Sequence, residues 1–228
     1  MSRLMTAAAV MVAALLSACA SKPQLPVPLN DAAIKATDAR IGVVMAPLPK
    51  ADTFFPGADC LLCIATASAV NSKLTTQAQT LGAEDLAALH KLATEAIGKR
   101  GGQAVTLVAP IQPEELPKLD GDVPNRARRD FRGLAAQHQV DRLLVVEIKQ
   151  LGFLRPYAAY IATDAPRAVV KGTAYLVNLK TNEYEWYLPI DVAKGAANWD
   201  QPPAYPDLTN AYYQAIELAK DAVLTPLR

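Results

Sequence analysis

The chain has 228 residues, of which 23 are lysine or arginine and 22 are aspartate or glutamate. Hydrophobic residues make up 51% and charged residues 20% of the chain, which is typical of a globular protein and excludes a wholly disordered one. A nucleic-acid-binding protein usually carries an excess of basic residues, so the near-zero net charge argues against that class. The length predicts one domain, or at most two small ones.

A hydrophobic leader opens the chain. Arg3 precedes an apolar run over residues 4–16, which is too short to span a bilayer comfortably and indicates a signal peptide. The run ends in Leu16-Ser17-Ala18-Cys19, and this tetrapeptide resembles the lipobox of bacterial lipoproteins. The resemblance implies that residues 1–18 are removed and that Cys19 carries diacylglycerol, with fatty acids such as palmitate, on its thiol. The alternative is an ordinary secretory signal with a chance cysteine.

The residues after Cys19 bear on where the protein is held. In enteric-type sorting an aspartate directly after the lipidated cysteine retains a lipoprotein in the inner membrane, so Ala20 favours the periplasmic face of the outer membrane. Residues 19–39 include Pro23, Pro26 and Pro28 and predict an extended tether, whose reach is at most roughly 60 Å. The alternative is a tail that lies against the domain.

The first half of the expected domain alternates strands and helices. An apolar run at residues 41–46 predicts a buried strand, and residues 103–108 predict a second one. Between them, residues 83–99 repeat apolar side chains at helical spacing and are followed by two glycines, which predicts a helix. Residues 124–138 predict another helix, with Phe131 on its inner face.

The second half begins with a strand over residues 143–154, which is apolar on both faces at its start and therefore central in the sheet. Residues 167–179 and 183–193 predict a hairpin. In its second arm Tyr184, Trp186, Leu188 and Ile190 alternate with more polar residues, so we expect this face, with Trp186, in the core. An amphipathic helix over residues 208–224 closes the chain.

These elements follow the order strand, helix, strand, helix, strand, strand, strand, helix. Two crossover connections followed by a meander predict an α/β fold, in which a mixed sheet of about five strands has helices packed on it. Residues 40–228 are expected to form a single periplasmic domain of this kind.

Two sequence segments and this order of elements resemble a known domain type. Residues 140–146 read Val-Asp-Arg-Leu-Leu-Val-Val, and residues 176–182 read Leu-Val-Asn-Leu-Lys-Thr-Asn. Both are similar to segments of the TolB amino-terminal-like domain, which occurs in envelope lipoproteins such as the curli-secretion lipoprotein and the activators of cell-wall synthases. The resemblance implies a non-enzymatic assembly or regulatory protein whose partner is another envelope protein or a cell-wall component. A subunit of a homo-oligomeric channel or scaffold is an alternative.

Cys60 and Cys63 form a Cys-x-x-Cys pair. In an oxidising compartment such a pair forms a structural disulfide by default. A redox centre is an alternative, but a thioredoxin-like pair lies at the start of a helix, whereas the prolines and glycine before Cys60 predict a loop. A zinc site that recruits His90 and His138 fits no finger spacing. We therefore expect a disulfide, with no metal and no cofactor.

An apolar stretch surrounds this pair, in what we expect to be a loop over residues 54–64. Loops seldom carry so many apolar residues unless they pack on the core or on a partner. The stretch is therefore either a stapled cover of the sheet or a docking surface formed by Phe54, Phe55, Leu61 and Leu62.

Two further surfaces are candidates for partner binding. Arg126, Arg129 and Arg132 share one face of the helix expected over residues 124–138, and they form either a solvated face or a contact for acidic groups of the envelope. Trp199 lies in a proline-rich loop that either clamps the last helix or faces a peptide or glycan.

The sequence carries none of the common catalytic motifs. It has no glycine-rich phosphate loop, no His-Glu-x-x-His and no Gly-x-Ser-x-Gly. We therefore expect a membrane-anchored binding, assembly or regulatory component of the cell envelope rather than an enzyme. A periplasmic thiol–disulfide enzyme that uses Cys60 and Cys63 is the alternative.

Overall fold

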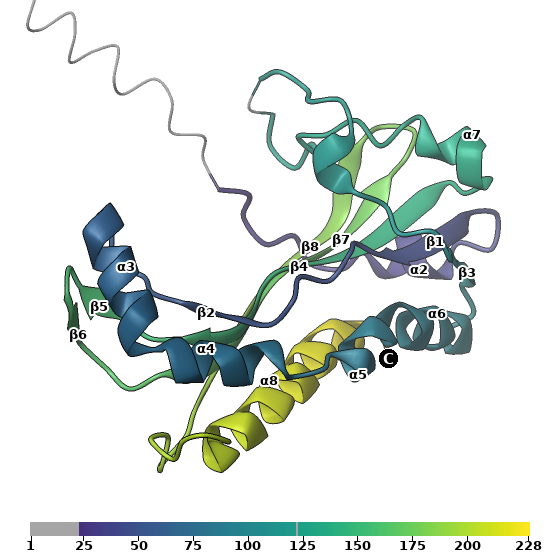
Figure 1. The fold of residues 1–228 in the computed structure, drawn as a ribbon. Helices are drawn as coiled ribbons and strands as arrows, with labels where there is room; N and C mark the ends of the chain where they lie inside the picture. Colours follow the sequence, from purple (N-terminus) through teal and green to yellow (C-terminus); the bar gives the residue numbers. More distant parts are fainter. Residues whose placement is uncertain (1–22, 122) are drawn as a thin grey trace, which may run out of the picture.

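The computed structural model describes residues 23–121 and 123–228, so the leader and Cys19 lie outside the described residues. A mixed six-stranded sheet forms its centre, in the order β3-β1-β4-β7-β8, with β2 beside the second half of β4 (Figure 1). The strands β1, β2 and β3 run parallel to their partners, whereas β7 is antiparallel to β4 and β8. The expected α/β fold with a mixed sheet is confirmed. The strands are β1 (Arg40–Met45), β2 (Asp52–Phe54), β3 (Gln103–Thr106), β4 (Arg142–Leu154), β7 (Arg167–Asn178) and β8 (Glu183–Gly195), with β5 (Tyr157–Ala158) and β6 (Ile161–Ala162) in a separate hairpin.

A layer of helices covers one face of the sheet. α8 (Pro206–Leu224) packs on β7 and β8, and α6 (Leu89–Lys99) packs on β1 and β3 (Figure 1). Buried apolar residues recur along α8 at three- and four-residue spacing, so one stripe of the helix faces the sheet. The larger core lies between these layers and includes Trp186, which is 3% exposed, as expected. The short helix α5 (Glu84–Ala87) precedes α6, so the helix expected over residues 83–99 is interrupted at Ala88.

An irregular segment between β3 and β4 covers part of the other face. It contains η1 (Pro113–Glu115) and α7 (Leu134–His138), and it encloses a second buried cluster around Phe131, Val145 and Tyr175. The helix expected over residues 124–138 is therefore wrong, apart from the turns of α7 at its end.

Asn182, in the turn between β7 and β8, explains this difference. Its side chain is 1% exposed, and its amide group donates hydrogen bonds to the carbonyls of Ala127 (3.1 Å) and Arg129 (2.9 Å). Its Oδ1 accepts a hydrogen bond from the Phe131 N–H (2.9 Å), and its backbone carbonyl accepts one from the Ala127 N–H (2.9 Å). These contacts use the backbone groups that a helix would have paired internally, so tertiary structure overrides the local pattern.

The loop expected over residues 54–64 is also corrected. β2 joins the sheet, and α3 (Leu61–Val70) begins directly after Cys60 and is followed by α4 (Ser72–Gln79). The sequence does not predict α3 because its residues are mostly apolar and show no helical period. α3 and the β5–β6 hairpin lie together at one end of the molecule, away from α7 (Figure 1).

The segment that follows the leader lies against the domain, where Gln24 donates a hydrogen bond to Asn125 Oδ1 at 3.2 Å. Val27 exchanges backbone hydrogen bonds of 2.9 and 3.0 Å with Tyr187 of β8. Asn30 then caps α2 (Asp31–Lys35), in which Ile34 is buried. The sequence predicts an extended tether over residues 19–39, but from Val27 onward this segment packs on the domain and includes a helix. None of the helices in the described part of the chain is long and apolar enough to cross a membrane.

Candidate ligand-binding site

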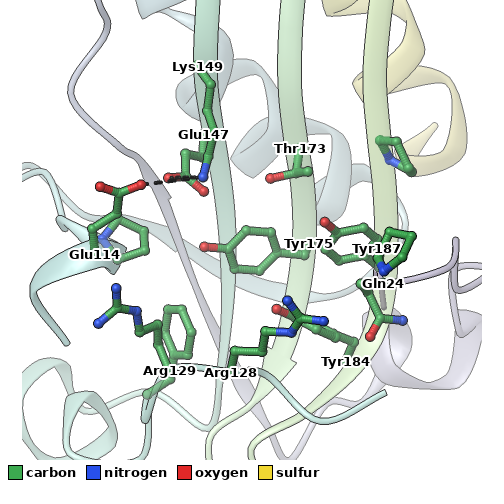
Figure 2. Close-up of a pocket in the computed structure, with 14 residues that line it drawn as sticks. Gln24, Glu114, Arg128, Arg129, Glu147, Lys149, Thr173, Tyr175, Tyr184 and Tyr187 are labelled. Carbon is green, nitrogen blue, oxygen red and sulfur yellow. Dashed lines mark hydrogen bonds and ion pairs between the residues drawn. The ribbon is translucent and has the colours of Figure 1, made fainter. Parts of the chain in front are cut away.

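A cavity of about 550 Å³ opens on the face of the sheet opposite α8 (Figure 2). Its floor consists of side chains from β4, β7 and β8, and its walls come from η1, from residues 128–131 and from the N-terminal segment. We call it the tyrosine cavity. Its lining includes Gln24, Glu114, Arg128, Arg129, Glu147, Lys149, Thr173, Tyr175, Tyr184 and Tyr187.

A bulge in β8 brings two of the tyrosines onto one face of the sheet. Trp186 and Tyr184 pair with consecutive residues of β7, so Glu185 is an extra residue in the strand. Tyr184 therefore shares a face with Tyr187, and the strict alternation that places Tyr184 beside Trp186 in the core is wrong. The displaced Glu185 carboxylate accepts a hydrogen bond from Arg142 Nε at 2.6 Å, which fixes the bulge.

The aromatic rings of the floor pack around Tyr175. This ring stacks on Tyr187 at a centroid distance of 6.1 Å and meets Tyr184 and Phe131 edge-on at 5.5 and 5.9 Å. The rings of Tyr184 and Tyr187 are 5.0 Å apart. Aromatic pairs of this kind contribute about 0.5–1.5 kcal/mol each beyond the area that they bury. The floor of the cavity is thus held in place by its own side chains.

The tyrosine hydroxyl groups are neutral hydrogen-bonding groups. Burial raises the pKa of Tyr175 well above its ordinary value, and the nearby Glu147 carboxylate raises it further. Burial also raises the pKa values of Tyr184 and Tyr187, so all three phenols keep their protons at neutral pH. None of the three hydroxyl groups makes a hydrogen bond to another residue in the described part of the chain. They can therefore both donate to and accept from a ligand.

Charged side chains surround this floor (Figure 2). Lys149 Nζ lies 3.5 Å from a carboxylate oxygen of Glu147 and 3.5 Å from one of Glu114. Arg129 donates a hydrogen bond from Nη1 to the Leu116 carbonyl at 2.9 Å, and Arg128 lines the same side. The rim thus presents both signs of charge around neutral aromatic groups.

The three arginines expected on one helix face contact different groups. Arg126 hydrogen-bonds to the Asp120 carbonyl, and Arg132 forms an ion pair with Asp130 at 2.7 Å. Only Arg129 of the three lines the tyrosine cavity. The shared arginine face is therefore wrong, because the expected helix does not form there.

The other residues singled out in the sequence lie outside the cavity. The expected disulfide joins Cys60 and Cys63. Leu61 and Leu62 are exposed beside it on α3, whereas Phe54 is half-buried in β2 and Phe55 packs edge-on against Tyr157 at 5.8 Å. Trp199 is half-buried, and the Arg155 guanidinium lies 4.6 Å from its ring. Within residues 23–121 and 123–228, no three His, Cys, Asp or Glu side chains gather where they could hold a metal ion.

Sequence reasoning misses the tyrosines that form the floor. The available signal is their density, since Tyr175, Tyr184 and Tyr187 all lie in one predicted hairpin. The bulge at Glu185 hides this signal, because strict alternation places Tyr184 and Tyr187 on opposite faces.

No model of a protein family matches the chain, and no curated protein matches it. Among solved structures, the PelC dodecamer from Paraburkholderia phytofirmans is similar at 9% identity, over 86% of this chain and 95% of that chain, with a TM-score of 0.33. Protein XCC0632 from Xanthomonas campestris, of the family DUF330, is similar at 13% identity, over 89% of this chain and 94% of that chain, with a TM-score of 0.36. At these scores the likeness carries no conclusion about function.

Proposed function

We propose that this protein is a binding component of the cell envelope and that its ligand occupies the tyrosine cavity, where no reaction takes place. The observation that supports this most is the floor of three tyrosines, whose hydroxyl groups have no partner within the described residues. Polar groups in a concave, largely apolar site are normally there to orient a ligand. A homo-oligomeric channel or scaffold stays an alternative prediction.

We further propose that the ligand is a fragment of the cell wall, which combines sugar rings with short peptides. Tyrosine offers an apolar ring face together with a hydroxyl group, which suits sugars and amides alike. Arg128 and Arg129 at the rim place positive charge next to the floor, which suits the carboxylates of the peptide part. The cavity volume of about 550 Å³ lies in the range usual for small-molecule sites.

Replacing Tyr187 with alanine is expected to weaken the binding of soluble cell-wall fragments about tenfold, which corresponds to about 1.4 kcal/mol. The half-buried Tyr187 ring forms part of the floor, while its backbone bonds to Val27 do not depend on the side chain. Tyr187→Phe keeps the ring and removes only the hydroxyl group, so we expect a loss of about threefold. Titration calorimetry measures both losses.

Tyr213→Ala is the matched control for this experiment. Tyr213 is 44% exposed on α8, outside the tyrosine cavity, so its removal is expected to leave the affinity unchanged. If the Tyr187→Ala protein binds the fragments as tightly as the unchanged chain, the cavity is not their site.

The membrane anchor is proposed at Cys19, on the strength of the lipobox. Because Gln24 is hydrogen-bonded to Asn125 and Val27 is fixed to β8, the spacer after Cys19 includes no residue beyond 26, and it reaches at most roughly 20 Å. The domain is therefore proposed to lie close to the periplasmic face of the outer membrane.

Cys19→Ala is expected to abolish labelling by radioactive palmitate. Without the thiol no lipid is attached, so the protein either stays in the membrane with its leader uncleaved or becomes soluble. A double change of Cys60 and Cys63 to serine serves as the control and is expected to keep the label. A Cys19→Ala protein that still carries palmitate and still fractionates with the outer membrane rules out the lipoprotein proposal.

A further inference from the structure

The helix α3 is uncharged and mostly apolar, and yet it lies on the surface. Its ten residues carry no charge, and Leu61, Leu62 and Val70 are 89%, 69% and 70% exposed. Within the helix only Cys63 and Ala67 are buried. A helix of this composition is normally covered, and exposed apolar patches mark places where another molecule binds. α3 therefore presents an exposed apolar surface.

The disulfide between Cys60 and Cys63 lies at the start of this helix. Cys60 is the N-cap residue, and its Sγ accepts a hydrogen bond from the Cys63 N–H at 3.0 Å. The Tyr160 hydroxyl lies 3.7 Å from the same sulfur and is the donor, because a disulfide sulfur carries no hydrogen. Cys60 is exposed, whereas Cys63 is 3% exposed. Of the two sulfurs, that of Cys60 is the one open to attack.

These contacts stabilise a thiolate at Cys60 once the bridge has opened. The N-terminus of a helix carries partial positive charge, and the Cys63 N–H already points at the sulfur. A disulfide whose reduced form is stabilised in this way is the stronger oxidant. The loop expected from the sequence offers no such stabilisation, so the presence of α3 changes the chemistry of the pair.

We propose that the Cys60–Cys63 bridge oxidises the thiols of a protein substrate that docks on α3. A substrate thiolate attacks Cys60 Sγ and forms a mixed disulfide, while Cys63 leaves and takes up a proton. A second substrate thiolate then attacks the substrate sulfur of the mixed disulfide and releases the Cys60 thiolate. The substrate loses two electrons, which the cysteine pair gains, and a small disulfide such as glutathione disulfide restores the bridge.

The surface around the bridge indicates the kind of substrate. Leu61 and Leu62 follow Cys60 directly, and Tyr160 and Ile161 of the nearby hairpin are 52% and 72% exposed. A groove of about 830 Å³ continues beside α3 and is lined by Ile64 of the next turn and by side chains of β2 and β4. The groove also carries Asp52 and Lys171, but the exposed side chains of Leu61, Leu62, Tyr160 and Ile161 next to the bridge are apolar or aromatic. They suit an incompletely folded polypeptide whose cysteines are flanked by apolar residues.

The first experiment uses the full chain with reduced glutathione and, separately, with glutathione disulfide. We expect reduced glutathione in excess to open the bridge of the native protein. In Cys63→Ser, Cys60 is a free thiol, and we expect its thiolate to attack glutathione disulfide, so that one glutathione stays on Cys60 and the other leaves as a thiolate. Cys60→Ser is expected to form no adduct, because Cys63 is buried. Alkylation followed by mass spectrometry measures each species. The opening of the bridge is measured on the unchanged chain, so this result does not depend on whether a variant folds.

The second experiment uses reduced, unfolded ribonuclease A as a protein probe. Leu61→Ser together with Leu62→Ser is expected to slow its oxidation about tenfold, by removing apolar contact area. The same variant is expected to react with glutathione at the unchanged rate, since glutathione is too small to need the docking surface. A bridge that resists glutathione in the native protein, or two cysteines that react equally, overturns the proposal. An equal loss of rate with both probes overturns the docking surface.

Discussion

Asn182→Ala is expected to lower the free energy of unfolding by about 3–4 kcal/mol. The side chain makes three hydrogen bonds to backbone groups of residues 127–131, in a place where no solvent reaches it. Each bond contributes about 1 kcal/mol, and its removal leaves a backbone group without a partner. The backbone of Asn182 also has a φ of 63°, a left-handed conformation that asparagine tolerates better than alanine.

Urea denaturation measures this loss, and two further variants separate its causes. Asn182→Gly removes the three hydrogen bonds but is comfortable at positive φ, so we expect it to keep about 3 kcal/mol of the loss. Asn178→Ala is the control, since this half-buried side chain accepts hydrogen bonds from the N–H groups of Lys180 and Thr181 in the same turn and donates one to Glu185. We expect it to cost about 1 kcal/mol. Equal losses at both positions contradict the special role of Asn182.

The same substitution also tests how the fold supports the site. Residues 127–131 supply Arg128, Arg129 and Phe131 to one wall of the tyrosine cavity, and Asn182 fixes their backbone. An Asn182→Gly protein that still folds is therefore expected to bind cell-wall fragments more weakly, although Asn182 itself does not line the cavity.

The sequence predicts best those elements that show a regular period. The central strand β4, the β7–β8 hairpin and the helix α8 are found close to their expected bounds. Each has a long apolar pattern, with a period of two or of three to four residues, that local structure and burial both require. The mixed sheet follows from the order of these elements.

The elements that the sequence misses depend on contacts between distant segments. Asn182 prevents a helix over residues 124–133. Its hydrogen bond to Phe131 joins two positions that are 51 residues apart in the chain. The helix α3 shows no helical period, because its apolar residues are spread around the whole helix. The tyrosine cavity combines three strands with two distant loops and depends on a one-residue bulge at Glu185. No local pattern predicts such a combination.

Trp186→Ala is expected to lower the free energy of unfolding by about 3–5 kcal/mol, the usual cost of removing a large aromatic side chain from a core. Trp186 lies on the face of β8 that α8 covers, next to Leu176 of β7, and only 3% of it is exposed. The substitution removes apolar contacts and leaves a cavity between the sheet and α8, and the surrounding side chains refill such a cavity only partly.

The second tryptophan of the chain is the matched control. Trp199 is half-buried in the loop before α8 and contacts the Arg155 guanidinium, so Trp199→Ala is expected to cost about 0.5–1 kcal/mol. In each variant the remaining tryptophan reports unfolding by its fluorescence, and urea denaturation of the two proteins gives the difference directly. A loss below about 1 kcal/mol for Trp186→Ala contradicts a packed sheet–helix interface at this position. The bulge at Glu185 sets which face of β8 carries Trp186 and which carries Tyr187. That result would therefore also contradict the position of the bulge and the arrangement of tyrosines in the floor of the cavity.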